Sequence, residues 1–182
     1  MRQNPRSRIE DNSPESMNRQ AWTIYGQFQL DRGFRTPDPD RIHWGTPGDA
    51  GPGTGVLGDI GGKRLLDLGC GGGHYAAHLA RDHRAVVDAI DVAPTQHERA
   101  LLQYADVPRV RFLLGDAVDH LHRCEPYDLV YSVHGLGYLH PHHTTACPPC
   151  TAACAPADGS SSPSSTPTFT AGRPQAASNR DN

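Results

Sequence analysis

The sequence predicts an α/β fold, in which a parallel β-sheet carries helices on both faces. Short apolar segments alternate with longer segments of helical periodicity from residue 61 to about residue 140. The links between them are short, and the first apolar segment ends in a run of glycines that opens the next helix. Strands and helices that alternate in this way form parallel strands joined by right-handed crossovers.

The individual elements follow from their local patterns. Trp22, Tyr25 and Phe28 recur at helical spacing and predict a helix over residues 17–32. A loop dense in proline, glycine and aspartate follows, and a short helix is expected near residues 54–59. Buried strands are predicted at residues 64–68, 85–90, 110–114 and 129–133, and helices at residues 73–82, 94–104 and 118–122.

The two ends of the chain are predicted to be disordered, over residues 1–16 and 141–182. The C-terminal 42 residues hold 8 Ala, 7 Pro, 6 Ser and 6 Thr, and Phe169 is their only large apolar residue. Such a segment cannot bury enough apolar surface to offset the entropy of ordering its backbone, about 1–2 kcal/mol per residue. Order is therefore expected between these ends, where residues 17–60 form an N-terminal helix and loop.

Composition and charge argue against several classes of function. The 182-residue chain has a formal net charge of −3 and no basic stripe, which argues against nucleic-acid binding. No apolar run approaches the about 18–20 residues of a membrane span, and the N-terminus has no apolar signal segment. The five cysteines are an odd number, and Cys70 and Cys124 stand alone in periodic segments. This pattern argues against a disulfide scaffold and favours a reducing, cytoplasmic environment.

The glycine-rich turn after the first predicted strand is the most informative motif. Gly69, Gly71 and Gly73 have G-x-G-x-G spacing, and Asp67 stands two positions before them. Glycine permits positive φ and close approach of a ligand, at the strand end where open α/β sheets bind ligands. A dinucleotide site requires G-x-G-x-x-G, and His74 stands where its last glycine would be.

With its flanking strand and helix, this stretch resembles motif I of class I methyltransferases that use S-adenosylmethionine. The resemblance covers about residues 20–140 and implies a Rossmann-like sheet whose cofactor-binding half is residues 61–140. It also implies S-adenosylmethionine as the cofactor, with Cys70 among the turn residues that bind it. Because the family's sheet has seven strands, the resemblance implies that the sheet of this chain is incomplete at its C-terminal end.

Two acidic residues at later strand ends extend the resemblance. It implies that Asp91, which is followed by Val92, accepts hydrogen bonds from the cofactor's ribose hydroxyls. It also implies that Asp116 accepts from the adenine amino group, while the backbone N–H of Ala117 donates to the ring. Each acid has a structural alternative. Asp91 would be a solvated strand end or part of a helix cap, and Asp116 would be a helix N-cap, a role that can coexist with adenine binding.

The fourth strand and the N-terminal region supply the remaining candidate site residues. By the resemblance, Ser132, Val133 and His134 lie at the methionine end of the cofactor, where His134 would act as a general base. Tyr25 and Trp44 would cover the pocket as part of a lid formed by the N-terminal helix and loop. The alternatives are a surface or packing role for the histidine and core positions for the two aromatic residues.

The function that this resemblance implies is methyl transfer to a small-molecule acceptor. No Asn-Pro-Pro-Tyr sequence follows the fourth strand, which lowers the case for adenine or glutamine methylation. Two alternatives stay open, a nucleotide-binding oxidoreductase of Rossmann-like fold and a zinc-binding interaction protein. The second rests on Cys147, Cys150 and Cys154 beside several histidines. Few apolar residues are near to fold a zinc module around them, and no metal site is predicted.

The C-terminal tail has a further interpretation. Its bias toward alanine, proline, serine and threonine is that of GC-rich DNA translated in the wrong frame. In an alternative frame, TC- codons for Ser160, Ser161 and Ser162 would give three apolar residues in a row, as in a buried strand. We therefore expect that a frameshift near residues 139–146 has replaced the second half of a methyltransferase. The truncated chain would then bind its cofactor weakly or not at all.

Overall fold

The computed structural model describes residues 13–45, 51–135 and 151–154 of the chain. Its helices are α1 (Pro14–Asp31), α2 (His74–Asp82), α3 (Pro94–Tyr104) and α4 (Ala117–Leu121), with a short 3₁₀ helix, η1, at Gly53–Leu57. Its strands are β1 (Arg64–Leu68), β2 (Val86–Asp91), β3 (Val110–Leu114), β4 (Leu129–Ser132) and β5 (Thr151–Cys154). The first four strands begin and end within one residue of their predicted bounds, so the predicted alternation is confirmed.

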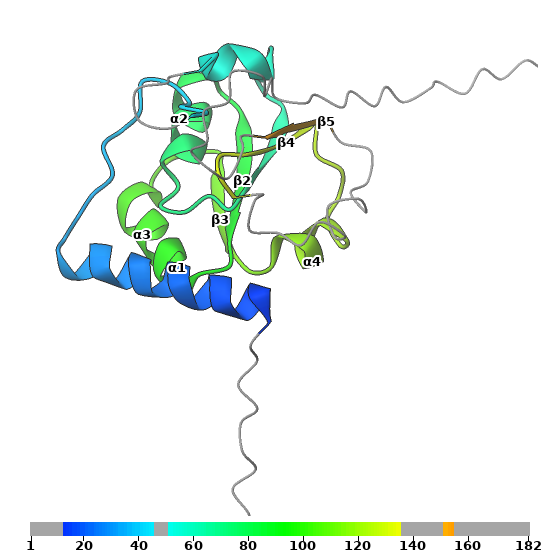
Figure 1. Ribbon diagram of the computed structural model, residues 1–182. Helices are drawn as coiled ribbons and strands as arrows, with labels where there is room; N and C mark the ends of the chain where they lie inside the picture. The colour runs from blue at the N-terminus through cyan, green and yellow to red at the C-terminus, as the bar shows by residue number, and fades with distance from the viewer. Residues whose placement is uncertain (1–12, 46–50, 136–150, 155–182) are drawn as a thin grey trace, which may run out of the picture.

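All five strands run parallel, in the order β3-β2-β1-β4-β5 (Figure 1). The chain builds outward from β1 through β2 to β3, and it then returns to the other side of β1 for β4. This reversal makes the carboxyl ends of β1 and β4 the topological switch point, where an open α/β sheet forms its ligand crevice. Every candidate binding residue that follows a strand therefore lies at the same edge of the sheet.

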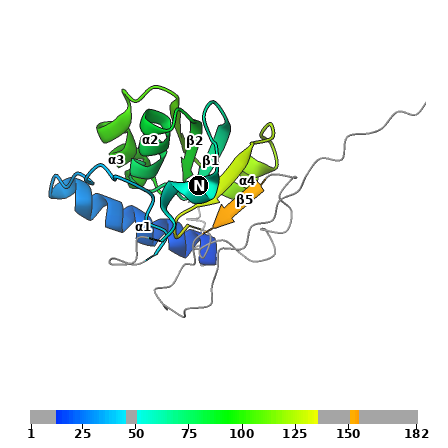
Figure 2. The same cartoon turned by 90° about the horizontal axis from the view of Figure 1, so that it is seen from above.

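Alternate residues of the central strands build two cores, one on each face of the sheet. The larger core includes the fully buried side chains of Leu65, Leu79, Val87 and Tyr131. The smaller core surrounds Leu66 on the opposite face, where α4 packs. Helices α2 and α3 lie on one side of the strands and α4 on the other (Figures 1 and 2). The expected arrangement of helices on both faces is therefore confirmed.

Asp88 is a charged residue in the middle of β2, and its neighbours explain why a buried strand tolerates it. Arg111 lies directly opposite on β3 and donates two hydrogen bonds to the carboxylate, at 2.9 and 2.8 Å. Arg64 donates a third at 3.2 Å and the Tyr127 hydroxyl a fourth at 2.7 Å. Burial raises the pKa of Asp88, but the hydrogen bonds from Arg111 and Tyr127 outweigh it and leave the pKa below its ordinary value.

Helix α1 begins three residues earlier than predicted, at Pro14. Ser13 is the N-cap, and its side chain accepts from the backbone N–H of Ser16 at 3.2 Å. The predicted disorder of the N-terminal segment therefore does not hold for the first turn of α1. The helix packs on α3, where the Thr95 hydroxyl donates to the carbonyl of Thr23 at 2.7 Å. This packing places α1 across the carboxyl edge of the sheet.

The predicted disorder of residues 141–182 does not hold for Thr151–Cys154, which form β5 and pair with β4. The rest of that segment lies outside the described residues. β4 pairs with β1 on one side only, so without β5 its other side would present a row of unpaired N–H and C=O groups. Because backbone groups alone make a parallel ladder, a segment without large apolar side chains can occupy that edge.

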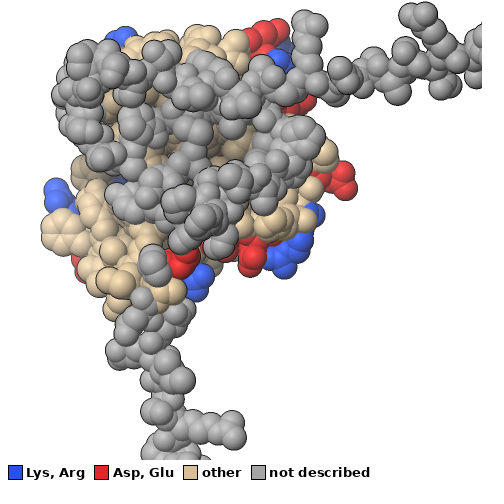
Figure 3. Space-filling view, turned by 45° about the vertical axis from the view of Figure 1, so that its right-hand side comes forward, with Lys and Arg blue, Asp and Glu red and all other residues tan. Residues whose placement is uncertain are grey.

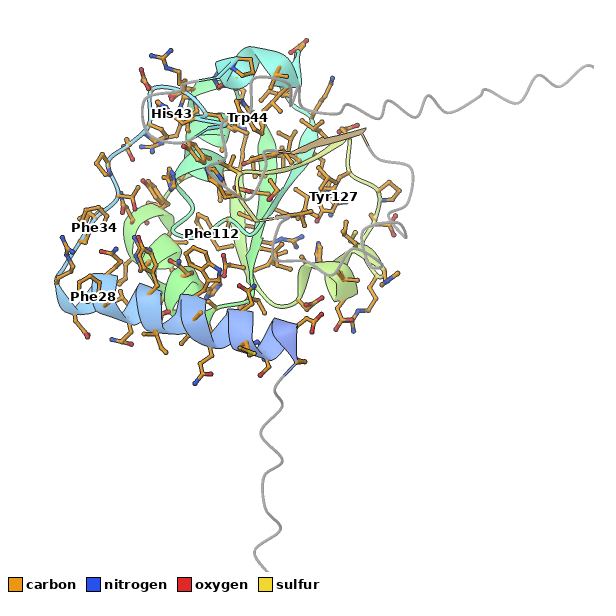
Figure 4. The ribbon with its side chains drawn as sticks, viewed as in Figure 1. Phe28, Phe34, His43, Trp44, Phe112 and Tyr127 are labelled. Atoms are coloured by element: carbon orange, nitrogen blue, oxygen red, sulfur yellow. The ribbon has the colours of Figure 1, made fainter. Side chains whose placement is uncertain are left out.

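The surface of the described part carries charges of both signs. On the face that Figure 3 shows, acidic and basic side chains of the described residues are interspersed. Phe28 and Phe34 lie near the C-terminal end of α1 (Figure 4), and the Arg32 guanidinium lies 5.3 and 5.5 Å from the centres of their rings. Within the part of the chain that the structure describes, no helix combines the length and hydrophobicity that a membrane span needs.

Candidate functional site

A cavity of about 510 Å³ lies between α1 and the carboxyl ends of the central strands. Ligand sites commonly have volumes of about 300–1,000 Å³. Eleven of the fourteen residues predicted for the site line this cavity. They are Tyr25, Asp67, Gly69, Cys70, Gly71, Asp91, Val92, Asp116, Ala117, Val133 and His134. The structure thus brings together residues that are up to 109 positions apart in the sequence.

The glycine turn has the left-handed backbone that its sequence predicts. The φ angle is +71° at Gly69, +54° at Gly71 and +78° at Gly73, values that other residues adopt only with strain. A Cβ built at Gly71 would meet no atom within 4 Å, so the turn leaves open space at this position of the cavity wall. The N–H groups of Gly69 and Cys70 donate to the carbonyl of Ile90 at 2.9 and 3.0 Å, which fixes the turn against β2.

Gly73 lies behind the turn rather than in the cavity wall, and it is the N-cap of α2. A Cβ at this position would lie 2.5 Å from the ring of Phe112 and 3.1 Å from the Cβ of Ala100. Glycine is therefore required here both by the positive φ and by the close packing of α2 on β3 and α3.

Asp91 ends β2 and connects the glycine turn to the start of α3. Its Oδ2 accepts from the N–H of Gly71 at 2.8 Å, and its Oδ1 accepts from the N–H of Ala93 at 2.9 Å. Burial raises the pKa of Asp91, although these backbone hydrogen bonds act in the opposite direction. A carboxylate has about four acceptor positions, so Asp91 keeps acceptor capacity beyond these two bonds.

Asp67 is the most deeply buried acid of the cavity, with 3% of its surface exposed. The hydroxyl of Tyr131 on β4 donates to its Oδ2 at 3.0 Å. Burial raises the pKa of Asp67 to about 7, the hydrogen bond from Tyr131 opposes this, and the nearby charge of Asp91 adds to it. This carboxyl therefore changes protonation near neutral pH.

Asp116 is the N-cap of α4, which confirms the structural alternative for this residue. Its Oδ1 accepts from the N–H groups of Val118 and Asp119, both at 2.9 Å. Asp116 and Ala117, the first residue of α4, both line the cavity. The cap uses a single carboxylate oxygen, so the geometry is compatible with a second role, and adenine binding stays a prediction.

The end of β4 passes close to the end of β1. The fully buried Ser132 hydroxyl donates to the carbonyl of Leu68 at 2.7 Å, so Ser132 ties the two strands together without lining the cavity. At Gly135, a Cβ would overlap that same carbonyl. Between them, Val133 and His134 line the cavity, and His134 has a φ of +68°, which is uncommon for a residue other than glycine.

The two aromatic residues predicted to cover the pocket lie in different places. Tyr25 of α1 lines the cavity, is 45% exposed and has its ring centre 5.5 Å from that of Trp22. The structure does not bring Trp44 to the cavity. Its indole N–H donates to the carbonyl of Gly53 at 2.6 Å, and its ring packs edge-on to Tyr131 at 6.5 Å. Trp44, labelled in Figure 4, occupies the core position that the sequence left as its alternative.

Sequence reasoning missed a second group of cavity residues. They include Ser13, Glu15, Ser16, Asn18, Arg19, Trp22, His74, Tyr75 and Gln96. Those at the start of α1 had a local signal, since Ser13 is followed by Pro14 and this pair is typical of an N-cap and a first helical residue. The remaining residues of this group had no local sequence signal for a place in the cavity, because their positions depend on how α1, α2 and α3 pack.

His74, the first residue of α2, is held neutral. Burial, together with the charge of Arg99, lowers its pKa to about 4. Its ring centre lies 4.1 Å from that of Tyr75, and its Nδ1 is buried without a hydrogen-bond partner among the described residues. The cavity wall at the start of α2 therefore carries an uncharged imidazole at neutral pH.

The zinc alternative gains no support from the described residues. They contain no group of three His, Cys, Asp or Glu side chains that could hold a metal ion. Cys147 and Cys150 lie outside the described residues, and Cys154 belongs to β5.

Comparisons with known proteins agree with this geometry. The sequence model of the family described as "Methyltransferase domain" matches residues 65–157. The O-methyltransferase rstn1 of Aspergillus nomiae is 31% identical over 86 residues, which are 46% of this chain and 38% of that protein. The ubiquinone biosynthesis O-methyltransferase of Neisseria meningitidis serogroup C is 49% identical over 47 residues, 26% of this chain and 20% of that protein. The chain thus spans less than half the length of these relatives.

A solved structure has the same fold. Phosphoethanolamine N-methyltransferase 1 of Haemonchus contortus, in complex with phosphoethanolamine and S-adenosylhomocysteine, aligns with a TM-score of 0.52 and 16% sequence identity. The alignment covers 77% of this chain and 32% of that chain. At this identity the similarity concerns the fold alone.

Proposed function

Because the chain belongs to the family of methyltransferase domains, we propose that it binds S-adenosylmethionine in the cavity and transfers the methyl group to a small-molecule acceptor. One observation carries the proposal. Asp67, Asp91 and Asp116 come from β1, the end of β2 and the loop after β3, and all three line one cavity together with the glycine turn. The family match does not favour a nucleotide-binding oxidoreductase.

The donor and acceptor groups of the cavity fit this cofactor. Asp91 retains acceptor capacity for ribose hydroxyls, and the second carboxylate oxygen of Asp116 can accept from the adenine amino group. Ala117 lines the cavity next to Asp116, and its backbone N–H would donate to the ring. The open space at Gly71 lets a ligand approach the turn, where a side chain would otherwise project.

The residues at the other end of the cavity would serve the reaction. The bound cofactor supplies an electrophilic methyl group, so the protein has to align the acceptor with it and exclude water. Val133 and the side chains of Trp22 and Tyr25 would shield this end from solvent. We propose His134 as the general base that takes the proton from the acceptor, because this residue lines the cavity just after the end of β4.

We further propose a hydroxyl group as the acceptor. Two relatives that match parts of this chain are named O-methyltransferases. The named N-methyltransferase shares the fold, but its low identity does not extend its acceptor to this chain.

The first test is cofactor binding. Ligand-observed NMR with S-adenosylhomocysteine detects weak as well as tight binding, which matters because the frameshift hypothesis predicts weak binding or none. We expect the wild type to bind and Asp91→Asn to lose about tenfold or more in affinity, because a charged acceptor is lost. Asp106→Asn is a matched control, since Asp106 is exposed and does not line the cavity. No binding by the folded wild type, or equal binding by Asp91→Asn, would contradict the proposed cofactor site.

The second test is methyl transfer. The chain is incubated with methyl-labelled S-adenosylmethionine and a panel of phenols, with phosphoethanolamine as the amine control. Label on a phenol oxygen that is reduced in His134→Gln, without loss of cofactor binding, is the expected result. Label on the amine alone would refute the hydroxyl acceptor, and cofactor binding without any transfer would refute the transfer step.

A further inference from the structure

Arg19 on α1 is the only lysine or arginine among the described residues that line the cavity. The acids of the same wall are Glu15, Asp67, Asp91 and Asp116. S-adenosylmethionine is positively charged overall, because it carries a sulfonium and an ammonium group against a single carboxylate. Acids in the wall therefore suit this cofactor, whereas a nearby cation opposes its charge. Arg19 indicates a second ligand that is negatively charged.

The side chain of Arg19 is exposed, and it forms no ion pair with any residue in the part of the chain that the structure describes. Glu15 lies four positions earlier on the helix, a spacing that favours such a pair, yet no ion pair joins the two. The backbone carbonyl of Arg19 accepts from the Thr23 hydroxyl at 2.7 Å, which does not use the guanidinium. The donors of the guanidinium therefore remain available to a ligand.

Two aromatic side chains follow Arg19 along the cavity wall. Trp22 lies about one helical turn after Arg19, and Tyr25 about one turn after Trp22. Their ring centres are 5.5 Å apart, and their planes stand at 84° to each other. Helix α1, drawn in blue in Figure 1, carries these three residues past the carboxyl ends of the strands. A cation beside two aromatic rings fits an aromatic ligand with an anionic substituent.

The chemistry of this wall favours a carboxylate over a phosphate. A guanidinium can donate two parallel hydrogen bonds to either group. A phosphate monoester carries a charge of about −1.5 to −2 at pH 7, however, and Arg19 is the only lysine or arginine among the described lining residues. Glu15, on the same helix, would repel a second negative charge further. A carboxylate, with its single charge, matches the single guanidinium.

We propose that Arg19 binds a carboxylate of the methyl acceptor, whose aromatic ring packs against Trp22 and Tyr25. The inference rests on the proposed function and narrows its acceptor from phenols in general to phenolic acids. Arg19 is then a specificity-determining residue, because it selects the acceptor through a group other than the reacting hydroxyl. Glu15 lowers the affinity for the same carboxylate by like-charge repulsion.

A pair of related aromatic compounds tests the proposal. para-Hydroxybenzoate and para-hydroxybenzamide share the ring and the hydroxyl group, but only the first carries a negative charge at neutral pH. Their affinities for the full chain, saturated with S-adenosylhomocysteine, are measured by ligand-observed NMR. We expect the wild type to bind the benzoate about tenfold more tightly, through charge-assisted hydrogen bonds. Arg19→Gln should lose this preference and keep its affinity for the benzamide and for S-adenosylhomocysteine.

Arg35→Gln is the matched control, since Arg35 is exposed, does not line the cavity and undergoes the same change of charge. It should keep the preference for the benzoate. Arg19→Lys should keep part of the preference, because lysine has the charge without the paired donors. Glu15→Gln should bind the benzoate more tightly than the wild type and the benzamide equally. Tyr25→Leu should weaken both compounds by the same factor, because the ring contact does not depend on charge.

The possible results have distinct meanings. Equal affinities of the wild type for the two compounds, a preference that persists in Arg19→Gln, or one that is lost equally in Arg35→Gln would each overturn the inference. A loss of S-adenosylhomocysteine affinity in Arg19→Gln would also overturn it, because Arg19 would then serve the cofactor. A chain that binds S-adenosylhomocysteine but neither aromatic compound would overturn the inference and leave the cofactor site in place. A folded wild type that does not bind S-adenosylhomocysteine would refute the proposed function and the inference together.

Discussion

Replacing Gly73 by alanine tests the packing that positions the glycine turn. The substitution places a Cβ on a residue with φ of +78°, 2.5 and 2.9 Å from two ring carbons of Phe112 and 3.1 Å from the Cβ of Ala100. Contacts below about 3 Å require atoms to move, and an aromatic ring between a strand and two helices has little room to do so. We therefore expect a destabilised chain whose glycine turn has shifted away from β3.

Two contributions give the magnitude. Left-handed backbone costs an alanine about 1–2 kcal/mol, and overpacking of a filled site costs about 1–3 kcal/mol. Alanine also reduces the entropy of the unfolded chain, which returns about 0.4–1 kcal/mol. The expected loss in the free energy of unfolding is therefore about 1–5 kcal/mol, which is substantial against the about 5–15 kcal/mol that stabilises a typical domain.

The assay is urea unfolding followed by circular dichroism, with Gly62→Ala as the control. Gly62 has a similar φ of +73°, but a Cβ there would meet no atom within 4 Å. Gly62→Ala therefore carries the backbone cost alone, and its difference from Gly73→Ala isolates the contact with Phe112. If Gly73→Ala is unfolded in buffer, the double variant with Phe112→Ala should recover folding.

Equal losses in Gly73→Ala and Gly62→Ala would refute this reasoning, because the steric contribution would then be absent. The same conclusion would follow if Phe112→Ala were as destabilising in the Gly73→Ala background as it is in the wild type. Packing between α2 and β3 would then not be what keeps a glycine at this position.

Three further predictions concern single residues and the reading frame. The pKa of Asp67 is about 7 in the folded chain and about 3.9 in the unfolded chain, so the wild type should lose stability as the pH rises from about 4 to about 7. Asp67→Asn removes this titration. In urea unfolding, its free energy of unfolding relative to that of the wild type should therefore increase by more than about 1.4 kcal/mol between pH 5 and pH 8. Trp44→Phe should lower the free energy of unfolding by about 1 kcal/mol, through loss of the hydrogen bond to Gly53, while ligand titration finds unchanged S-adenosylhomocysteine affinity. Sequencing of the gene should find an alternative open frame that begins near residues 139–146 and matches the family better there than the present frame, whose match ends at residue 157. Early stop codons in both other frames would contradict the frameshift.

The parts of the fold that the sequence predicts well are those with strong local patterns. β1 is an apolar run that ends in glycines, and its burial on both faces leaves few alternatives. Asp88 was not explained from the sequence, because its partner Arg111 becomes its neighbour only through the register of β2 and β3. β5 could not be predicted from side-chain patterns, because Thr151–Cys154 pair through backbone groups offered by the edge of β4.

The site follows the same division. The glycines and strand-end acids were found because chain direction and strand ends alone bring them to one edge of the sheet. Gln96 was missed, because helical periodicity places it on α3 without saying what that face meets. Trp44 could not be placed from the sequence, because an aromatic residue in a loop can either cover a pocket or fill a core. The path of the loop in the folded chain determines which of the two it does, and here Trp44 belongs to the core.

Asp116 illustrates how a structural role and a binding role can share one residue and still be separated. Its cap of α4 needs an acceptor near the backbone, and serine is about as good an N-cap as aspartate, whereas alanine costs about 1 kcal/mol. Adenine binding would need the second carboxylate oxygen, which serine lacks. Asp116→Ser should therefore keep the stability of the wild type but weaken S-adenosylhomocysteine, while Asp116→Ala should lose both.

S-inosylhomocysteine, which has an oxygen in place of the adenine amino group, completes this test. Its affinity should not fall in Asp116→Ser, because it has no amino group to donate to the carboxylate. If Asp116→Ser binds both ligands as the wild type does, capping is the residue's whole role. If it weakens both ligands equally, the serine has disturbed the start of α4, and the adenine amino group is not what Asp116 recognises.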